Sequence, residues 1–183
     1  DWSSDVCSSD LSPAFKMPSK LDVKAGDFVM VQVTKEETGL KGARLTANIS
    51  IPGRYVVYLP RLDFVGVSNK ITDESERKRL MALLEKLKPA GGGFIARTAS
   101  REAKKQDIAD EARRLQKEFD GVCSAYASAE GVGLMRSEGG LIVRAVRDMI
   151  SSSVESVVCN DRRVFLEVRE ALGKVNPRFN EKV

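Results

Sequence analysis

The feature that most constrains the fold of this chain is a change in the spacing of its apolar residues near Ile71. Before that point, apolar side chains alternate with their neighbours over 27–36 and 44–51, which is the period of a β-strand. Glycines at 39 and 42 predict a hairpin turn between these two runs, and a third short strand is expected over 54–60. After that point the spacing becomes three and four, which is typical of helices that face a core. The sequence therefore predicts the α+β class.

Two helices are predicted, one on each side of a short strand over 94–97. The first begins at Asp73, which forms a capping pair with Glu76 and precedes an apolar stripe that ends at Leu87. The second covers 106–126 and is marked by apolar side chains three and four residues apart: Ile108, Ala112, Leu115, Phe119, Val122 and Tyr126. Its carboxylates are expected on the opposite, solvated face: Asp107, Asp110, Glu111 and Glu118.

A third unit is predicted from about residue 141. It contains a helix over 141–150, a strand over 153–161 and a helix over 161–173. Because the chain ends where a further strand is expected to start, we interpret it as a piece of a longer protein.

The first eleven residues, DWSSDVCSSDL, differ from the rest of the chain. They are rich in Ser and Asp and resemble the translation of a sequencing adapter, so we interpret 1–11 as an artefact and exclude them from the fold. Without their three aspartates, the formal net charge rises from +4 to +7. A basic chain suits a polyanionic partner. There is also no apolar run long enough to span a bilayer and no signal core, so we expect a cytoplasmic protein without a membrane anchor in this chain.

No catalytic or metal site is expected within these residues. The chain has no histidine, and its carboxylates are predicted on a solvated helix face. The glycine-rich stretch over 89–94 precedes a strand and lacks the Gly-Lys-Ser/Thr of a P-loop, so it is interpreted as an ordinary loop.

Two groups of residues are candidates for binding. Arg97 and Thr98 place a guanidinium and a hydroxyl at the end of a strand, where they either bind a phosphate or leave the arginine paired with a surface carboxylate. Lys35, Lys41 and Arg44 gather near the hairpin tip, which is either a solvated turn or a nucleic-acid contact. The residues alone leave both alternatives open.

Four segments, in this order, resemble the ribonuclease E/G family of bacterial endoribonucleases, which cut single-stranded RNA: QVTKEETGLKGARLTANISIPGRYVVYLP, VGVSNKI, GGFIARTAS and LIVRAVRDMI. The resemblance implies partial OB-type β-barrel strands, then a mixed α/β sensor domain that recognises the 5′ end of RNA, then part of an RNase H-like subdomain. It implies that 12–47 are the end of the RNA-binding barrel, 48–140 the 5′-sensor domain and 141–183 the partial RNase H-like subdomain.

The resemblance also implies roles for individual residues. The Arg-Thr pair that binds a 5′-monophosphate in the family falls on Arg97 and Thr98, and neighbouring sensor positions fall on Gly53 and Val57. The basic barrel residue that contacts RNA falls on Lys41. The family's catalytic Mg²⁺ site and the Zn²⁺ cysteine motif that links its subunits lie outside this chain, which is therefore expected to be inactive alone.

The resemblance implies a function in RNA processing and decay, with single-stranded RNA carrying a 5′-monophosphate as the partner and a homo-oligomer as the full-length form. Two alternatives remain from the sequence. One is a stand-alone OB-type RNA-binding module without nuclease activity. The other is a structural or protein-interaction domain whose basic surface is incidental.

Overall fold

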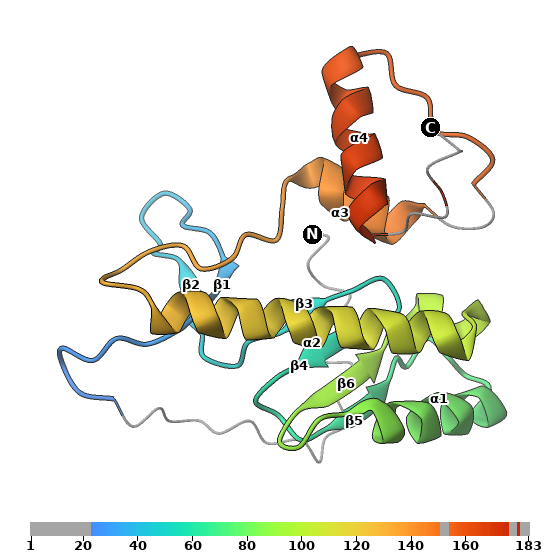
Figure 1. Cartoon of the computed structure of the whole chain (residues 1–183), viewed down its shortest axis with the longest axis horizontal. Helices are drawn as coiled ribbons and strands as arrows, with labels where there is room; N and C mark the ends of the chain where they lie inside the picture. Colours follow the sequence, from blue (N-terminus) through green and yellow to red (C-terminus); the bar gives the residue numbers. More distant parts are fainter. Residues whose placement is uncertain (1–22, 151–153, 176–178, 180–183) are drawn as a thin grey trace. The chain divides into compact units, whose positions relative to one another are not determined.

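The computed structural model describes residues 23–150, 154–175 and 179, and it has the predicted α+β composition (Figure 1). The adapter-like residues 1–11 and the start of the predicted barrel segment, 12–22, lie outside the described part. The chain divides into a first unit that ends at Val132 and a second that begins at Gly133. No described helix has the length and apolar character needed to cross a membrane.

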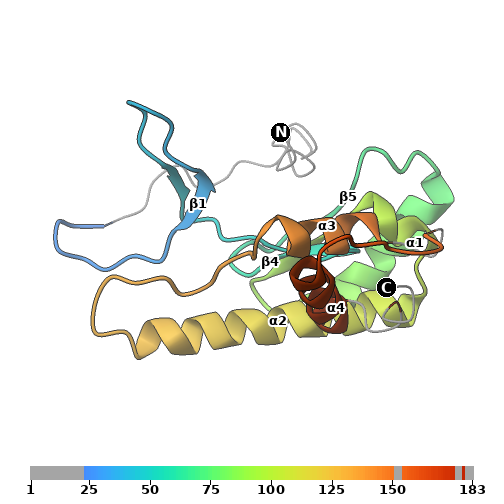
Figure 2. The ribbon, with the colours of Figure 1, turned by 90° about the horizontal axis from the view of Figure 1, so that it is seen from above.

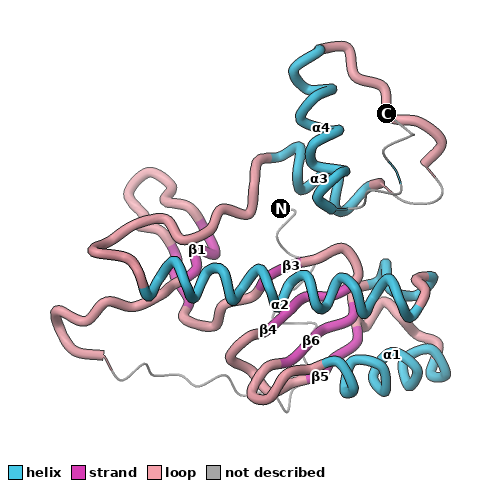
Figure 3. Tube along the Cα trace, in the orientation of Figure 1, coloured by secondary structure: helices cyan, strands magenta, loops and turns pink. Residues whose placement is uncertain are grey.

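The first strands form a two-stranded antiparallel sheet from β1 (Gln32–Lys35) and β2 (Arg44–Thr46), one of two sheets drawn in magenta in Figure 3. The predicted hairpin is confirmed. Thr38 and Lys41 exchange two backbone hydrogen bonds of 3.0 Å across a turn in which Gly39 has a φ of +56°. Several apolar side chains of this segment are exposed to solvent: Phe28, Val31, Val33 and Leu45.

The strand predicted over 44–51 is interrupted after Thr46. The Thr46 hydroxyl accepts a hydrogen bond from the Asn48 amide at 3.1 Å, which bends the backbone. The Gln32 side chain then takes the place of a pairing strand, because its amide group donates to the Ser50 carbonyl and accepts from the Ser50 amide. Strand pairing resumes only at β3 (Ile51–Pro52).

A four-stranded sheet forms the centre of the first unit, in the order β3, β4 (Val56–Leu59), β6 (Gly93–Ala96) and β5 (Val65–Val67). β5 runs parallel to β6, whereas the other pairs are antiparallel. Parallel neighbours need a crossover, and helix α1 (Glu74–Leu87) provides it. β5 was not predicted, because three residues are too few to reveal a period.

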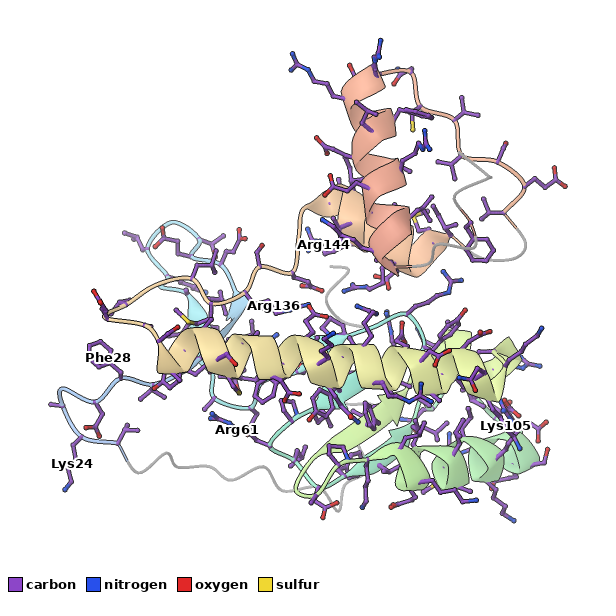
Figure 4. The ribbon with its side chains drawn as sticks, viewed as in Figure 1. Lys24, Phe28, Arg61, Lys105, Arg136 and Arg144 are labelled. Carbon is purple, nitrogen blue, oxygen red and sulfur yellow. The ribbon has the colours of Figure 1, made fainter. Side chains whose placement is uncertain are left out.

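Two helices lie beside this sheet, α1 and α2 (Lys105–Ala127) (Figure 1, Figure 2). The rings of Tyr58 and Phe119 meet edge to face, with centroids 6.2 Å apart, which ties α2 to β4. The predicted cap of α1 is confirmed, since the Asp73 carboxylate accepts hydrogen bonds from the Ser75 and Glu76 amides. Figure 4 labels Lys105 at the start of α2 and Phe28 near its end, where the Phe28 carbonyl accepts a 2.7 Å hydrogen bond from Tyr126.

The second unit contains helices α3 (Leu141–Met149) and α4 (Arg162–Val175), which confirms the two predicted helices. The strand predicted over 153–161 is wrong for residues 154–161, which form no strand; residue 153 is outside the described part. The described residues of this unit include no strand that could pair with the segment. Instead, Val157 and Cys159 pack against the helices, in a cluster that includes Val168 and Leu172. The alternation of apolar residues over 154–161 therefore reflects packing onto helices and not a strand.

Candidate functional site

Arg97 follows the last residue of β6, and hydrogen bonds hold its backbone amide, its carbonyl and its guanidinium. Its backbone amide donates to the Tyr55 carbonyl at 2.8 Å, which extends the pairing of β6 with β4 by one step. Its carbonyl accepts hydrogen bonds from the Ser100 amide at 3.0 Å and the Ser100 hydroxyl at 2.5 Å. Its guanidinium donates from Nη1 to the Gly53 carbonyl at 2.6 Å. The side chain is half-buried, and the guanidinium is held beyond the C-terminal end of β6, an inner strand of the sheet.

Thr98 is exposed and begins the short 3-10 helix η2 (Thr98–Glu102). Its hydroxyl lies 3.4 Å from the hydroxyl of Ser68, which comes from the loop after β5. That loop is anchored because the Ser68 amide donates to Ala96 and the Ser68 carbonyl accepts from Arg77 on α1. Two hydroxyls therefore meet at the residue that follows Arg97 in the chain. No local pattern in the sequence marks Ser68, and only the parallel pairing of β5 with β6 brings it to Thr98.

Gly53 lies in the connection between β3 and β4, and Val57 lies in β4 itself. Gly53 is buried and contacts Arg97 through its carbonyl. Val57 is 2% exposed, and its side chain packs with Leu59 and Ile95 in an apolar cluster of the sheet. The structure thus brings Gly53 into contact with Arg97, whereas Val57 contributes a buried apolar side chain to the core from β4.

Glu111 corrects the expectation that all the carboxylates of α2 are solvated. Its residue exposure is 7%, and its carboxylate accepts hydrogen bonds from three consecutive amides: Arg54 at 2.8 Å, Tyr55 at 2.6 Å and Val56 at 3.0 Å. Arg114 Nη2 lies 3.7 Å from the same carboxylate. The sequence held a signal for this, because Glu111 is three residues after Ile108 and four before Leu115, on the apolar stripe.

Lys41 lies apart from these residues in the fold. It ends the turn of the β1–β2 hairpin, where its backbone pairs with Thr38, and its side chain is exposed. Gly53, Val57, Arg97 and Thr98 belong instead to the four-stranded sheet or its connections.

Within residues 23–150, 154–175 and 179, no group of three or more Cys, Asp or Glu side chains is arranged to hold a metal ion. The described residues therefore do not fit a Mg²⁺ or Zn²⁺ site, and no catalytic step through a metal is assigned to them.

Known proteins resemble the chain over most of its length. Residues 50–183 match the Ribonuclease E/G family. Ribonuclease G of Haemophilus influenzae is 35% identical over 161 residues, which cover 88% of this chain and 33% of that protein. Ribonuclease E of Nostoc sp. is 38% identical over 144 residues, covering 79% of this chain and 21% of that protein, and ribonuclease G of Escherichia coli K12 is 32% identical over 161 residues.

This chain accordingly spans a third or less of the length of these relatives. The matched residues include both the four-stranded sheet with its two helices and the second unit with α3 and α4. From the match over 50–183 and the identities with both ribonucleases, the chain belongs to the ribonuclease E/G family.

Proposed function

We propose that this chain is the RNA-binding and 5′-monophosphate-sensing portion of a ribonuclease E/G-type endoribonuclease that acts on single-stranded RNA in RNA processing and decay. In this proposal, 12–47 are the end of an OB-type barrel, 48–140 the sensor and 141–183 part of an RNase H-like subdomain. The catalytic Mg²⁺, the Zn²⁺ link between subunits and the homo-oligomer belong to the full-length protein, with both metals bound outside this chain.

The observation that carries the proposal is the fixed guanidinium of Arg97, whose chain neighbour Thr98 places its hydroxyl against that of Ser68. The 2.6 Å bond to the Gly53 carbonyl restrains the plane of the guanidinium, and the planar fork of arginine matches phosphate oxygens. The hydroxyls of Thr98 and Ser68 lie 3.4 Å apart and supply neutral donors at the residue that follows Arg97. A terminal phosphomonoester carries about −1.5 to −2 charges near neutral pH, more than an internal phosphodiester, so such a site favours an RNA end.

The backbone amides of residues 54–56 and of Arg97 form hydrogen bonds within the protein. Those of Arg54, Tyr55 and Val56 donate to Glu111, and that of Arg97 donates to Tyr55. In the proposed function these four amides therefore hold the site together, and the side chains of Arg97, Thr98 and Ser68 contact the phosphate.

The test compares the affinity of a short single-stranded RNA with a 5′-monophosphate and of the same RNA with a 5′-hydroxyl. The unsubstituted chain is expected to prefer the monophosphate. Arg97→Gln should remove most of this preference, about 1.5 to 3 kcal/mol for a hydrogen bond to a charged group. Arg113→Gln is the matched control, because Arg113 is an exposed arginine of α2 that pairs with Asp110 at the surface.

Lys41→Ala should lower the affinity for both RNAs by the same factor, because an exposed lysine at a hairpin tip would contact an internal phosphate. If Arg97→Gln instead lowers both affinities equally, Arg97 is a general backbone contact and the sensing function is wrong.

The stand-alone OB-type module is not favoured, since the family match over 50–183 lies entirely beyond 12–47, the segment assigned to the barrel. The protein-interaction alternative predicts that RNA affinity is absent or insensitive to salt, whereas phosphate contacts weaken steeply as salt rises.

A further inference from the structure

Glu111 is an acidic side chain inside the first unit, facing the Gly53–Val56 turn between β3 and β4. A buried carboxylate is costly unless hydrogen bonds and charges compensate it. Here its Oε1 accepts from the Arg54 amide, and its Oε2 accepts from the Tyr55 and Val56 amides. Three successive amide dipoles and the nearby Arg114 guanidinium compensate the charge, so Glu111 is a built part of this turn.

The Gly53–Val56 turn is altered by this contact. In a tight hairpin turn the carbonyl of the first residue usually accepts the amide of the fourth. Here the Gly53 amide donates to the Val56 carbonyl at 2.8 Å, but the Val56 amide donates to Glu111. The Gly53 carbonyl accepts instead from Arg97 Nη1. By taking the Val56 amide, Glu111 leaves the Gly53 carbonyl oriented toward the guanidinium.

The space around the carboxylate shows how closely it is fitted to the turn. A Cβ at Gly53 would lie 2.6 Å from Glu111 Cδ and 2.7 Å from its Oε2, closer than real contacts allow. Only glycine at position 53 permits the carboxylate to reach all three amides. Gly53 and Glu111 therefore act as one unit, with Arg97 attached to it through the Gly53 carbonyl.

We propose that Glu111 is a positioning residue for the 5′-phosphate site: it shapes the Gly53–Val56 turn so that the Gly53 carbonyl fixes the guanidinium of Arg97. This inference rests on the proposed function. Glu111 itself does not contact the phosphate, because its oxygens face the amides of the turn.

The experiment measures the ratio of affinities for the 5′-monophosphate and 5′-hydroxyl forms of one short RNA. Three proteins are compared: the unsubstituted chain, Glu111→Gln and Glu118→Gln. A glutamine at 111 keeps one acceptor oxygen but turns an NH₂ toward an amide donor, so the turn loses part of its support. Glu118 is the matched control, because it lies on the same helix and its carboxylate pairs with Arg114 near the surface at 3.4 Å.

Glu111→Gln is expected to lower the affinity ratio about tenfold, which corresponds to one hydrogen bond to a charged group, while changing the affinity for the hydroxyl RNA less than about twofold. Glu118→Gln should leave the ratio unchanged. A stability effect alone would lower both affinities together, so the ratio separates positioning from folding. A folded Glu111→Gln variant with an unchanged ratio would overturn the inference and leave the proposed function intact.

If the unsubstituted chain shows no preference for the monophosphate, the proposed function fails, and this inference fails with it. If Glu111→Gln does not fold, amide exchange in the unsubstituted chain decides the matter. The amides of Arg54, Tyr55 and Val56 are expected to exchange slowly, both without RNA and with the monophosphate RNA bound. Rapid exchange of these amides, or a loss of their protection when RNA binds, would overturn the inference.

Discussion

Gly53→Ala tests the packing of the proposed site most severely, because the added methyl group has no space. The new Cβ would lie 2.6 Å from Glu111 Cδ and 2.8 Å from the Val56 carbonyl oxygen, and the latter is backbone that cannot rotate away. Overpacking of this kind costs about 1 to 3 kcal/mol. If the carboxylate moves away instead, buried amides lose their acceptor at about 1 to 3 kcal/mol each. We therefore expect a loss of about 2 to 4 kcal/mol in the free energy of unfolding of the first unit.

The assay is urea unfolding followed through the amide signals of β4 and β6 in NMR spectra, so that the first unit is observed separately from the second. Gly121→Ala is the matched control, because Gly121 lies within α2 and a Cβ there meets nothing within 4 Å. Alanine in a helix interior should be stabilising, by about 0.5 to 1 kcal/mol. A Gly53→Ala variant within about 0.5 kcal/mol of the unsubstituted chain would refute the close fit between Gly53 and Glu111.

Two further substitutions test the surroundings of the site, and a third tests the cap of α1. Ser100→Ala removes the buried hydroxyl that donates to the Arg97 carbonyl. It should lower the free energy of unfolding by about 1 kcal/mol in the same urea assay and reduce the preference for the monophosphate RNA. An unchanged preference would show that this bond does not orient Arg97. Thr98→Val should reduce the preference less than Arg97→Gln, since it removes a neutral donor; an equal or larger loss in the binding assay would reverse the assigned roles. Hydrogen bonds from Ser75 lower the pKa of Asp73 below its usual 3.8, so its cap stabilises α1 above that value and the contribution is lost as pH falls through the lowered pKa. Asp73→Asn keeps an acceptor but cannot titrate, and circular dichroism should show a smaller loss of helix on acidification; an identical acid profile would exclude Asp73 as the cause.

Much of the fold follows from local pattern in the sequence. The stripes of α1 and α2, the Asp73 cap and the glycine turn between β1 and β2 each depend on residues close together in the chain, and all three were predictable. The elements that were missed depend on distant partners. β5 has three residues and is recognisable only through its pairing with β6, and the loss of strand pairing at Ser50 depends on the side chain of Gln32.

The candidate site shows the same division. Arg97 and Thr98 stand out because polar residues follow a short apolar strand, but Ser68 reaches them only through parallel pairing of β5 and β6. Glu111 was assigned to the solvated face because of its charge, although its spacing from Ile108 and Leu115 places it on the buried stripe. The amides that donate to its carboxylate lie 55 to 57 residues away in the chain, so no local pattern could identify them. At this position the spacing of the residue predicts its burial, and its charge does not.

The most direct test of the central proposal is an NMR difference map between two complexes of the same chain. One contains a short RNA with a 5′-monophosphate and the other contains the same RNA with a 5′-hydroxyl, each at saturation. The proposed function predicts that the differences in chemical shift concentrate on Arg97, Thr98, Ser68 and Gly53, including the side-chain Nε signal of Arg97, while the hairpin turn at Lys41 responds equally to both RNAs. Identical spectra at those four residues, or differences concentrated on the hairpin, would contradict it.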